Sequence, residues 1–294
     1  MKSGFVSLVG RPNVGKSTLL NSILERKIAI TSNVSGTTRN IIQGIYNDDE
    51  AQIVFIDTPG IHKPQNKLGT LMNKKAYTMA DDVDIVLFLV DVSKGYGKGD
   101  NFILERLKEL NKPVILVMNK VDTIKKDKLL ELINQYKDLY DFTEIVPLSA
   151  LKGDNVVELI KTIKKYLNEG MKYYSDDEVT NVSRNFMLSE MVREKVLRLT
   201  KDEVPHSVTC LVEEYNEEEN SVHLRVLVIV DRDNLKKIII GKNGQMLKEI
   251  GIKARIDMEE FLGKKVFLET YVKTIDNWKD REKYLTEFGL NELE

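Results

Sequence analysis

The sequence has little cysteine, little net charge and no long hydrophobic run, and each absence excludes a class of protein. Its one cysteine, Cys210, cannot form an intramolecular disulfide, so we expect a reducing compartment and a buried thiol in a strand. No stretch approaches the roughly 18 apolar residues of a membrane-spanning helix. The formal net charge of -2 is not that of a broadly basic nucleic-acid binder, so any basic surface must be local.

The remaining composition is that of a globular protein. The 294 residues are enough for two compact domains, and 42% hydrophobic with 31% charged residues is an ordinary balance. A predicted strand begins at Phe5, which leaves no room for a secretory signal peptide. We therefore expect a cytoplasmic protein, and nothing in the sequence demands more than a monomer.

The first half alternates short apolar runs with segments of helical period, which predicts an α/β domain with a mostly parallel sheet. The expected strands are Phe5–Val9, Ile53–Ile56, Ile85–Val90, Val114–Met118 and Ile145–Leu148. A further strand at Ile41–Tyr46 is joined to the second by a polar turn, which predicts one antiparallel edge. A polar, aperiodic stretch then indicates a linker at residues 169–185 between domains at 1–168 and 186–294.

The second half has a different order of elements, typical of an α+β domain. We expect a helix near Met187–Leu199, two strands, a helix pair and a last strand. The later ranges are Val208–Glu213, Val222–Val230, a helix from Asn234 through Gly244, a helix near Ala254–Leu262, and a strand at Lys265–Val272. No internal repeat and no second phosphate-binding motif is present.

A phosphate-binding motif follows the first strand and opens a helix. It reads Gly10-Arg11-Pro12-Asn13-Val14-Gly15-Lys16-Ser17 and continues into Thr18. The glycines let backbone N–H groups point at a β-phosphate, and the helix N-terminus favours the anion. We expect Lys16 to bridge the β- and γ-phosphates and Ser17 to bind Mg²⁺.

Two later segments are predicted to complete the phosphate side of the site. The turn Asp57-Thr58-Pro59-Gly60 ends a strand, where Asp57 can hold Mg²⁺ through water and Gly60 can sense the γ-phosphate. The polar loop at residues 31–40 can order around the metal, and we favour Thr38 as its ligand, with Thr37 as a close alternative.

Guanine recognition is predicted at the ends of the last two strands of the sheet. Asn119-Lys120-Val121-Asp122 provides a carboxylate for N1–H and the 2-amino group of guanine, which adenine cannot satisfy. Ser149-Ala150-Leu151 provides a backbone N–H for guanine O6. Both segments fall at the edge where open α/β sheets bind ligands.

The sequence contains no obvious group to activate water. Ile61 follows Gly60 where related enzymes have a glutamine, and we interpret His62 as an exposed loop residue rather than a base. We expect Lys16, Thr38 and Gly60 to act on the phosphates, with slow intrinsic turnover. His206 and His223 have no partners at metal-ligand spacing and are interpreted as structural.

The motifs resemble those of translation-factor-related GTPases, in the group with a hydrophobic residue in place of the catalytic glutamine. Thr37-Thr38-Arg39 and Asp57-Thr58-Pro59-Gly60-Ile61 carry this resemblance, and Asn13 resembles a position that helps to hold K⁺ in several members. Ile240-Gly241-Lys242-Asn243-Gly244 looks like the Gly-x-x-Gly loop of a type II KH domain. A P-loop GTPase domain followed by one KH domain resembles the Era family of bacterial GTPases.

The resemblance implies binding to 16S ribosomal RNA near its 3′ end, a role in 30S subunit maturation, and association with the inner face of the membrane. A Gly-x-x-Gly loop clamps about four nucleotides by close approach to their backbone. The candidate RNA-binding residues are Lys236, Lys237, Ile240, Gly241, Lys242, Asn243, Gly244, Lys248 and Lys253. Ile238 and Ile240 are expected to floor the groove, and the acidic tip Glu217–Glu219 to turn away from RNA.

The sequence leaves two other functions open. An RNA-modifying enzyme with a GTPase module shares the Thr-Thr-Arg motif, but it has a catalytic cysteine near the C-terminus that is missing from residues 288–294. A membrane-bound signalling switch would use the second domain to bind protein. Retention on RNA against flotation with liposomes distinguishes that switch from an RNA-binding assembly factor.

Overall fold

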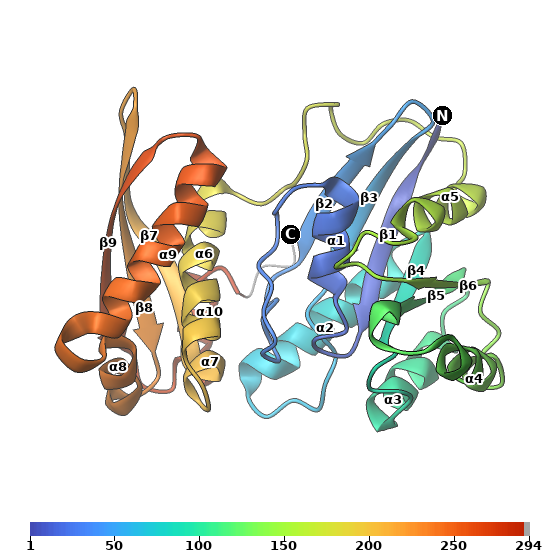
Figure 1. Ribbon diagram of the computed structural model, residues 1–294, viewed down its shortest axis with the longest axis horizontal. Coiled ribbons are helices and arrows are strands. Elements are labelled where there is room, and N and C mark those ends of the chain that lie inside the picture. Colours follow the sequence, from blue (N-terminus) through green and yellow to red (C-terminus); the bar gives the residue numbers. More distant parts are fainter. Residues whose placement is uncertain (291–294) are drawn as a thin grey trace.

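The computed structural model describes residues 1–290, and the predicted domain end at residues 291–294 lies outside the described residues. Two lobes lie side by side (Figure 1). The first contains a six-stranded sheet and the second a three-stranded sheet.

The sheet of the first lobe has the strand order β2-β3-β1-β4-β5-β6. Only the β2–β3 pair is antiparallel, which confirms the predicted mostly parallel sheet with one antiparallel edge. The strands are β1 (Lys2–Gly10), β2 (Ile42–Asn47), β3 (Ala51–Asp57), β4 (Ile85–Asp91), β5 (Val114–Asn119) and β6 (Glu144–Leu148).

Helices cover both faces of this sheet because its strands are apolar on both sides. In β4, Leu87 packs with α1 and α5 while Phe88 packs with α2, α3 and α4 on the opposite face. The helices are α1 (Lys16–Leu24), α2 (Lys67–Asp81), α3 (Lys98–Leu107), α4 (Lys126–Lys137) and α5 (Val156–Tyr166), with a short 3₁₀ turn η1 (Val121–Thr123). Because β1, β3 and β5 run in the same direction, their carboxyl ends lie at the same edge of the sheet.

The second lobe is an α+β unit, as the sequence predicts, and its sheet has the strand order β7-β8-β9. Its elements are α6 (Arg184–Leu199), α7 (Val204–Ser207), β7 (Val208–Glu217), β8 (Ser221–Val230), α8 (Asp233–Ile240), η2 (Lys242–Gly244), α9 (Gln245–Leu262), β9 (Lys265–Thr274), η3 (Trp278–Asp280) and α10 (Glu282–Glu287). Helices α6 and α9 pack on one face of the sheet, where Cys210 is buried.

The predicted start of the last long helix near Ala254 is wrong, because α9 begins at Gln245. Gly241 and Gly244 both have positive φ, at 71° and 75°, so the chain leaves one helix and enters the next within this loop. Ala254 lies in the interior of α9, where it is buried with Ile250 and Met258 at four-residue spacing.

The segment between the lobes is more ordered than its polar composition suggests. It passes along the top of the first lobe in the view of Figure 1 and then enters α6. Thr180 bridges to Gly44 in β2, and Gln52 accepts hydrogen bonds from the backbone N–H groups of Tyr173 and Tyr174 at 2.6 and 3.0 Å. The segment therefore covers part of the open edge of the sheet.

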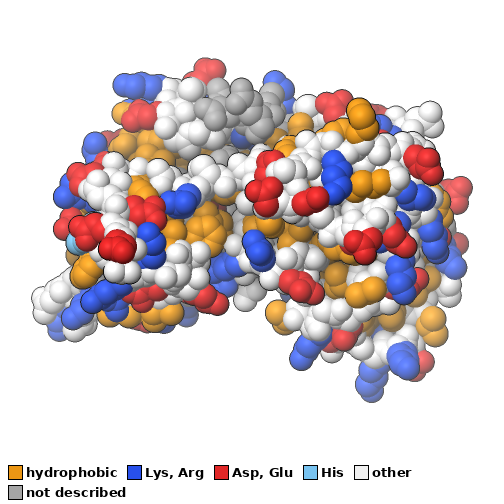
Figure 2. All heavy atoms as spheres, turned by 90° about the horizontal axis from the view of Figure 1, so that it is seen from above, with side chains coloured by type: hydrophobic (Ala, Val, Ile, Leu, Met, Phe, Trp, Pro, Cys, Tyr) orange, Lys and Arg blue, Asp and Glu red, His pale blue; other side chains and the backbone are white. Residues whose placement is uncertain are grey.

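Charged side chains of both signs alternate over the face seen in Figure 2, in keeping with the small net charge. Within residues 1–290 no helix combines the length and apolarity that a bilayer crossing requires. Any basic surface is therefore a local feature of a mixed surface.

Candidate functional site

The phosphate-binding loop is built from the residues between β1 and α1. Gly15 has φ of 101°, and a Cβ there would lie 2.3 Å from Asn119 Nδ2, so no other residue fits. Lys16 Nζ lies inside this loop and donates to the carbonyl oxygens of Gly10 and Arg11, each at 3.2 Å. Burial lowers the pKa of Lys16 to about 8, against the opposing effect of Asp57. A buried ammonium of this kind is placed to receive an anion.

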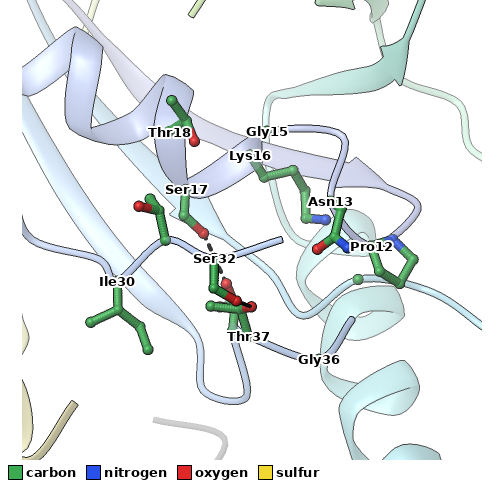
Figure 3. A pocket seen from close by; sticks show the side chains of 13 residues that line it. Pro12, Asn13, Gly15, Lys16, Ser17, Thr18, Ile30, Ser32, Gly36 and Thr37 are labelled. Carbon is green, nitrogen blue, oxygen red and sulfur yellow. Dashed lines mark hydrogen bonds between the residues drawn. The ribbon is translucent and has the colours of Figure 1, made fainter. Parts of the chain in front are cut away.

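Three oxygen-bearing side chains from different elements meet beside Lys16. Ser17 Oγ lies 2.8 Å from Thr38 Oγ1 and donates to Asp57 Oδ2 at 2.5 Å. Figure 3 shows Ser17 at the start of α1, with Ser32 and Thr37 of the 31–40 loop across from it. Thr37 Oγ1 is bonded elsewhere, at 2.6 Å from Ser32 Oγ and 2.7 Å from Val34 O. Of the two threonines weighed from the sequence, Thr38 is thus the one beside Ser17.

The chemistry of this cluster fits a magnesium ion. Asp57 is fully buried, and its Oδ1 has no hydrogen-bond partner within residues 1–290. Burial raises its pKa to about 6, although Lys16, Ser17 and Thr38 counteract the rise. Within the described residues, no group of three or more His, Cys, Asp or Glu side chains is arranged so that it could hold a metal ion. One carboxylate with hydroxyl groups suits Mg²⁺, which takes its other ligands from water and phosphate.

The predicted guanine-recognition residues also come together. Asn119 Nδ2 donates to Val14 O at 2.8 Å, and Asn119 Oδ1 accepts from Ala150 N at 3.0 Å. Lys120 Nζ donates to Asn13 O at 2.8 Å and to Asp91 Oδ2 at 2.6 Å. These bonds tie the phosphate loop to the two loops that follow β5 and β6.

The base side of the site is a cavity of about 390 Å³. Asp122, Lys120 and Leu151 line it together with residues of the phosphate loop and of the 31–40 loop. Asp122 is exposed in this cavity, and Asn119, which also lines it, is held by its bonds to Val14 O and Ala150 N. This arrangement offers an acceptor for the donor edge of a purine base.

The turn after β3 approaches the phosphate loop closely. A Cβ on Gly60 would lie 2.8 Å from both Cα and N of Pro12, which explains the glycine. Ile61 is buried in the core and donates its backbone N–H to Gly10 O at 3.2 Å. His62, which the sequence suggests is exposed, is only partly so: its Nδ1 lies 2.9 Å from Gly60 O. Thr58 Oγ1 donates to Leu8 O at 2.7 Å and is structural in this arrangement.

The second lobe carries a groove between α9 and β9. Its volume is about 740 Å³, and it is lined by His223, Gly244, Leu247, Lys248, Gly251, Ile252, Arg255, Val266, Phe267, Leu268, Glu269 and Thr270. The His223 ring stacks on Phe267 at 4.6 Å between centroids and 15° between planes. Such aromatic surfaces, beside lysine and arginine, are typical of grooves that take unstacked bases.

Only part of the predicted RNA-binding set lines this groove. Gly244 and Lys248 do, whereas Ile240 packs toward the core and Lys253 pairs with Glu249 at 2.8 Å. The structure places Lys236, Lys237, Gly241, Lys242 and Asn243 on α8 and the loop outside the lining residues. The sequence does not indicate that Phe267 and His223 line a groove, and His223 is interpreted there as structural, because alternation within a strand is the same on any exposed sheet face.

Comparison with known proteins assigns the two lobes separately. Residues 5–120 match the family model described as a 50S ribosome-binding GTPase, and residues 203–279 match the KH domain. A variant of Aquifex aeolicus Era bound to GDP.AlF4- is 44% identical, with 99% of this chain and 100% of that chain covered and a TM-score of 0.96. Era in complex with MgGDPNP and nucleotides 1506-1542 of 16S ribosomal RNA gives the same identity, coverage and TM-score.

The chain belongs to the Era family of GTPases. The type II KH fold expected from the resemblance is thereby confirmed, as is the P-loop GTPase domain. The match covers both lobes and the segment that joins them. It excludes the RNA-modifying alternative, whose resemblance was confined to the first domain.

In this Era-family chain, the second lobe holds the loop that carries Thr38. Arg193 of α6 donates to Thr37 O and is paired with Glu190 through Nε at 2.6 Å. Arg39 is buried, donates to Val208 O at 2.6 Å, and lies 5.6 Å from the centre of the Trp278 ring. Burial lowers the pKa of Arg39 to about 9, and Arg193 adds to the effect.

The start of the same loop is held at a second point. Glu194 of α6 accepts from Thr31 N at 3.0 Å and from Lys27 Nζ at 2.7 Å. Figure 1 shows α6 on the side of the second lobe that faces the first. The sequence predicts α6 as a helix but gives no sign that it contacts the nucleotide loop, because the contacts join residues more than 150 positions apart.

Proposed function

We propose that this chain is a magnesium-dependent GTP switch that binds the 3′ end of 16S ribosomal RNA through its KH domain and assists assembly and maturation of the 30S subunit. One observation carries the proposal: the loop bearing Thr38, beside Ser17 and Asp57, is also bonded to the domain that carries the RNA groove. The RNA complex of the Era relative supports the choice of RNA.

In the proposed nucleotide site, Lys16 and the N–H groups of the phosphate loop hold the β- and γ-phosphates. Ser17, Thr38 and Asp57 would hold Mg²⁺, and the ion would neutralise charge on the phosphate oxygens. The MgGDPNP in the Era relative supports this assignment. The N–H of Gly60 senses the γ-phosphate.

At the base end of the site, Asp122 accepts from the donor edge of guanine, and the N–H groups of the 149–151 loop face its O6. Asn119 acts mainly as a positioning residue, since its amide is bonded to Val14 O, Lys120 N and Ala150 N. Guanine covers the Asp122 acceptor and pairs with it, whereas adenine would cover it and leave it unpaired, which gives discrimination of about 10⁴-fold.

We infer slow hydrolysis, because Ile61 cannot orient water and His62 is bonded to the turn itself. Asn13 is proposed to take part in a K⁺ site. Its Nδ2 donates to Asn33 O at 2.7 Å, and Asn13 lines the phosphate end of the site. Comparing hydrolysis rates in K⁺ and Na⁺ at equal ionic strength tests this assignment.

On the RNA side, the Gly241–Gly244 loop is proposed to approach the backbone while bases enter the groove beside Phe267. A Cβ on Gly241 would lie 2.7 Å from the Met246 Cβ, whereas Gly244 faces open space within 4 Å. Lys236, Lys237, Lys242 and Lys253 then act as phosphate-contacting charges around the loop, and Lys248 acts as one within the groove. In the acidic tip, Glu217 pairs with Lys264 and Arg184 at 2.7 and 2.8 Å, which offsets the charge of that residue.

The test is a titration of a fluorescent RNA matching the 16S 3′ end, with a scrambled RNA as the comparison. Gly244→Asp should abolish selective binding, because it places a carboxylate where a phosphate passes. Gly263→Asp is the matched control, since Gly263 also has positive φ with open space around it but lies outside the groove. Equal, weak binding of both RNAs to all three proteins would refute the RNA function.

A non-hydrolysable GTP analogue and GDP should give different RNA affinities at constant salt, because the 31–40 loop lines the nucleotide site and is also bonded to the KH domain. A monomeric state and peripheral association with the inner face of the membrane stay predictions. Sedimentation and vesicle flotation test them.

A further inference from the structure

One side chain of the second domain lines the nucleotide cavity itself. Arg198, near the end of α6, lies on the wall of the 390 Å³ cavity together with Asp122, Lys120 and Thr31. The rest of that wall comes from the first domain. The cavity is therefore incomplete without the KH domain.

The guanidinium of Arg198 is fixed on one side and open on the other. Its Nη2 donates to Thr31 O at 2.9 Å, to Thr31 Oγ1 at 3.1 Å and to Glu194 Oε1 at 3.0 Å, and its Nε lies 3.2 Å from Thr31 O. Within residues 1–290 its Nη1 has no hydrogen-bond partner, and the side chain is 49% exposed. The two N–H groups of Nη1 are therefore available to a ligand.

The anchor of this arginine is firm. The Glu194 side chain has no exposed surface. Burial opposes its ionisation, but hydrogen bonds from Lys27 and from Thr31 N hold its pKa below the ordinary value. Glu194 thus carries its charge at neutral pH and keeps the guanidinium oriented.

The position along the cavity indicates which part of the nucleotide Arg198 faces. The phosphate end is lined by Lys16, Ser17 and Gly60, and the base end by Asp122 and Leu151. Both are continuous through a shared middle section, whose lining residues are Asn13, Gly15, Thr18, Thr31 and Ser32. The sugar of a nucleotide spanning both ends must lie in this middle section, where Arg198 is bonded to Thr31.

We propose that Arg198 is a nucleotide-binding residue whose guanidinium donates a hydrogen bond to a ribose hydroxyl of GDP and GTP. The inference rests on the proposed nucleotide function of this cavity and adds a contact from the KH domain. It follows that any ligand that moves the KH domain away from the 31–40 loop also loosens the nucleotide.

The test measures GDP binding by calorimetry, without a fluorescent group on the ribose. Arg198→Ala should weaken GDP about tenfold, the loss of one hydrogen bond from a charged donor. Arg198→Lys should recover part of this loss. Lys201→Ala is the control, because Lys201 is an exposed cation just beyond α6 that does not line the cavity.

Sugar analogues separate direct contact from an effect through Thr31. If Arg198 touches a hydroxyl, then 2′-deoxy- or 3′-deoxy-GDP binds the unmodified protein more weakly, and Arg198→Ala adds no further loss for that analogue. Unchanged GDP binding by Arg198→Ala, or losses that add fully for both analogues, would overturn the proposal.

The proposed nucleotide function is checked in the same series. Asp122→Asn should exchange preference for GDP with preference for xanthosine diphosphate, because the amide donates where the carboxylate accepts. If the unmodified protein ignores GDP, or Asp122→Asn shows no such exchange, the nucleotide assignment fails and the inference with it. A normal exchange with an indifferent Arg198→Ala overturns the inference alone.

Discussion

The buried pair of Arg193 and Glu190 gives a measurable test of how the KH domain holds the nucleotide loop. Arg193 is 1% exposed and Glu190 9%. The pair is bidentate, at 2.6 Å for Nε–Oε1 and 2.5 Å for Nη2–Oε2, and Nη2 also donates to Thr37 O. The perturbations are Arg193→Met alone and Arg193→Met combined with Glu190→Leu.

The two variants should differ in stability although both lose the bond to Thr37 O. Arg193→Met leaves a buried carboxylate without its partner, which costs about 3–5 kcal/mol. The double variant replaces both charges by apolar side chains of similar volume, so its main loss is one hydrogen bond to Thr37 O, about 1–2 kcal/mol. The expected gap between them is about 2–3 kcal/mol.

Urea unfolding followed by tryptophan fluorescence provides the assay. Trp278 is the only tryptophan, it is fully buried, and it lies between Arg39 and the sheet of the KH domain. The slope of the unfolding free energy against urea concentration is measured for each variant, because a changed slope would indicate a change in the surface exposed on unfolding rather than in stability alone. A double variant as unstable as the single variant would refute the reasoning, because the cost would then not come from the orphaned carboxylate.

The same proteins report on the nucleotide loop: both variants should weaken magnesium-dependent binding of a GTP analogue to a similar extent, since both free Thr37 beside Thr38. Two further predictions use the free energy of unfolding. The pKa of Glu194 is lowered in the folded protein, so its ionised form stabilises the fold at neutral pH, and this stabilisation is lost as the pH falls below about 5 through the folded pKa. The difference in free energy of unfolding between the unmodified protein and Glu194→Gln should therefore narrow over that range. A difference that stays constant with pH would contradict the lowered pKa. Gly244→Ala should lower the free energy of unfolding by about 1 kcal/mol, because it forces an alanine into positive φ. Gly241→Ala should lower it clearly more, because Gly241 also has positive φ and lacks room for a Cβ. Equal losses in the two variants would contradict this prediction.

The nucleotide site could be foreseen because its parts are local in sequence. Each motif follows a buried strand, and parallel strands end at one edge, so the order of strands alone brings Gly15, Asp57 and Asn119 together. The geometry adds what spacing cannot give. The sequence does not distinguish Thr37 from Thr38 as a metal ligand. The structure does, because Thr37 Oγ1 is bonded to Ser32 Oγ and Val34 O.

The RNA groove was predictable only in part. The Gly-x-x-Gly loop is visible in the sequence because glycine marks positive φ, and both glycines have it. The groove wall depends instead on which face of α9 packs against the core. The predicted start of that helix near Ala254 was too late in the chain to assign this face. With α9 beginning at Gln245, Ile250 and Ala254 face the core, while Leu247 and Ile252 face the groove.

The contacts between the domains could not be predicted, and the reason is physical. A buried arginine such as Arg39 looks like any exposed switch-loop charge until its partners are known, and those partners are two backbone carbonyls and an aromatic ring far along the chain. Every residue has a backbone carbonyl, so the sequence does not indicate which of them accepts from Arg39. Every one of these bonds joins the KH domain to the loop that carries Thr38. We therefore expect a displacement of the KH domain to change the position of Thr38 beside Ser17 and Asp57, because Arg39 and Thr37 join this loop to the KH domain.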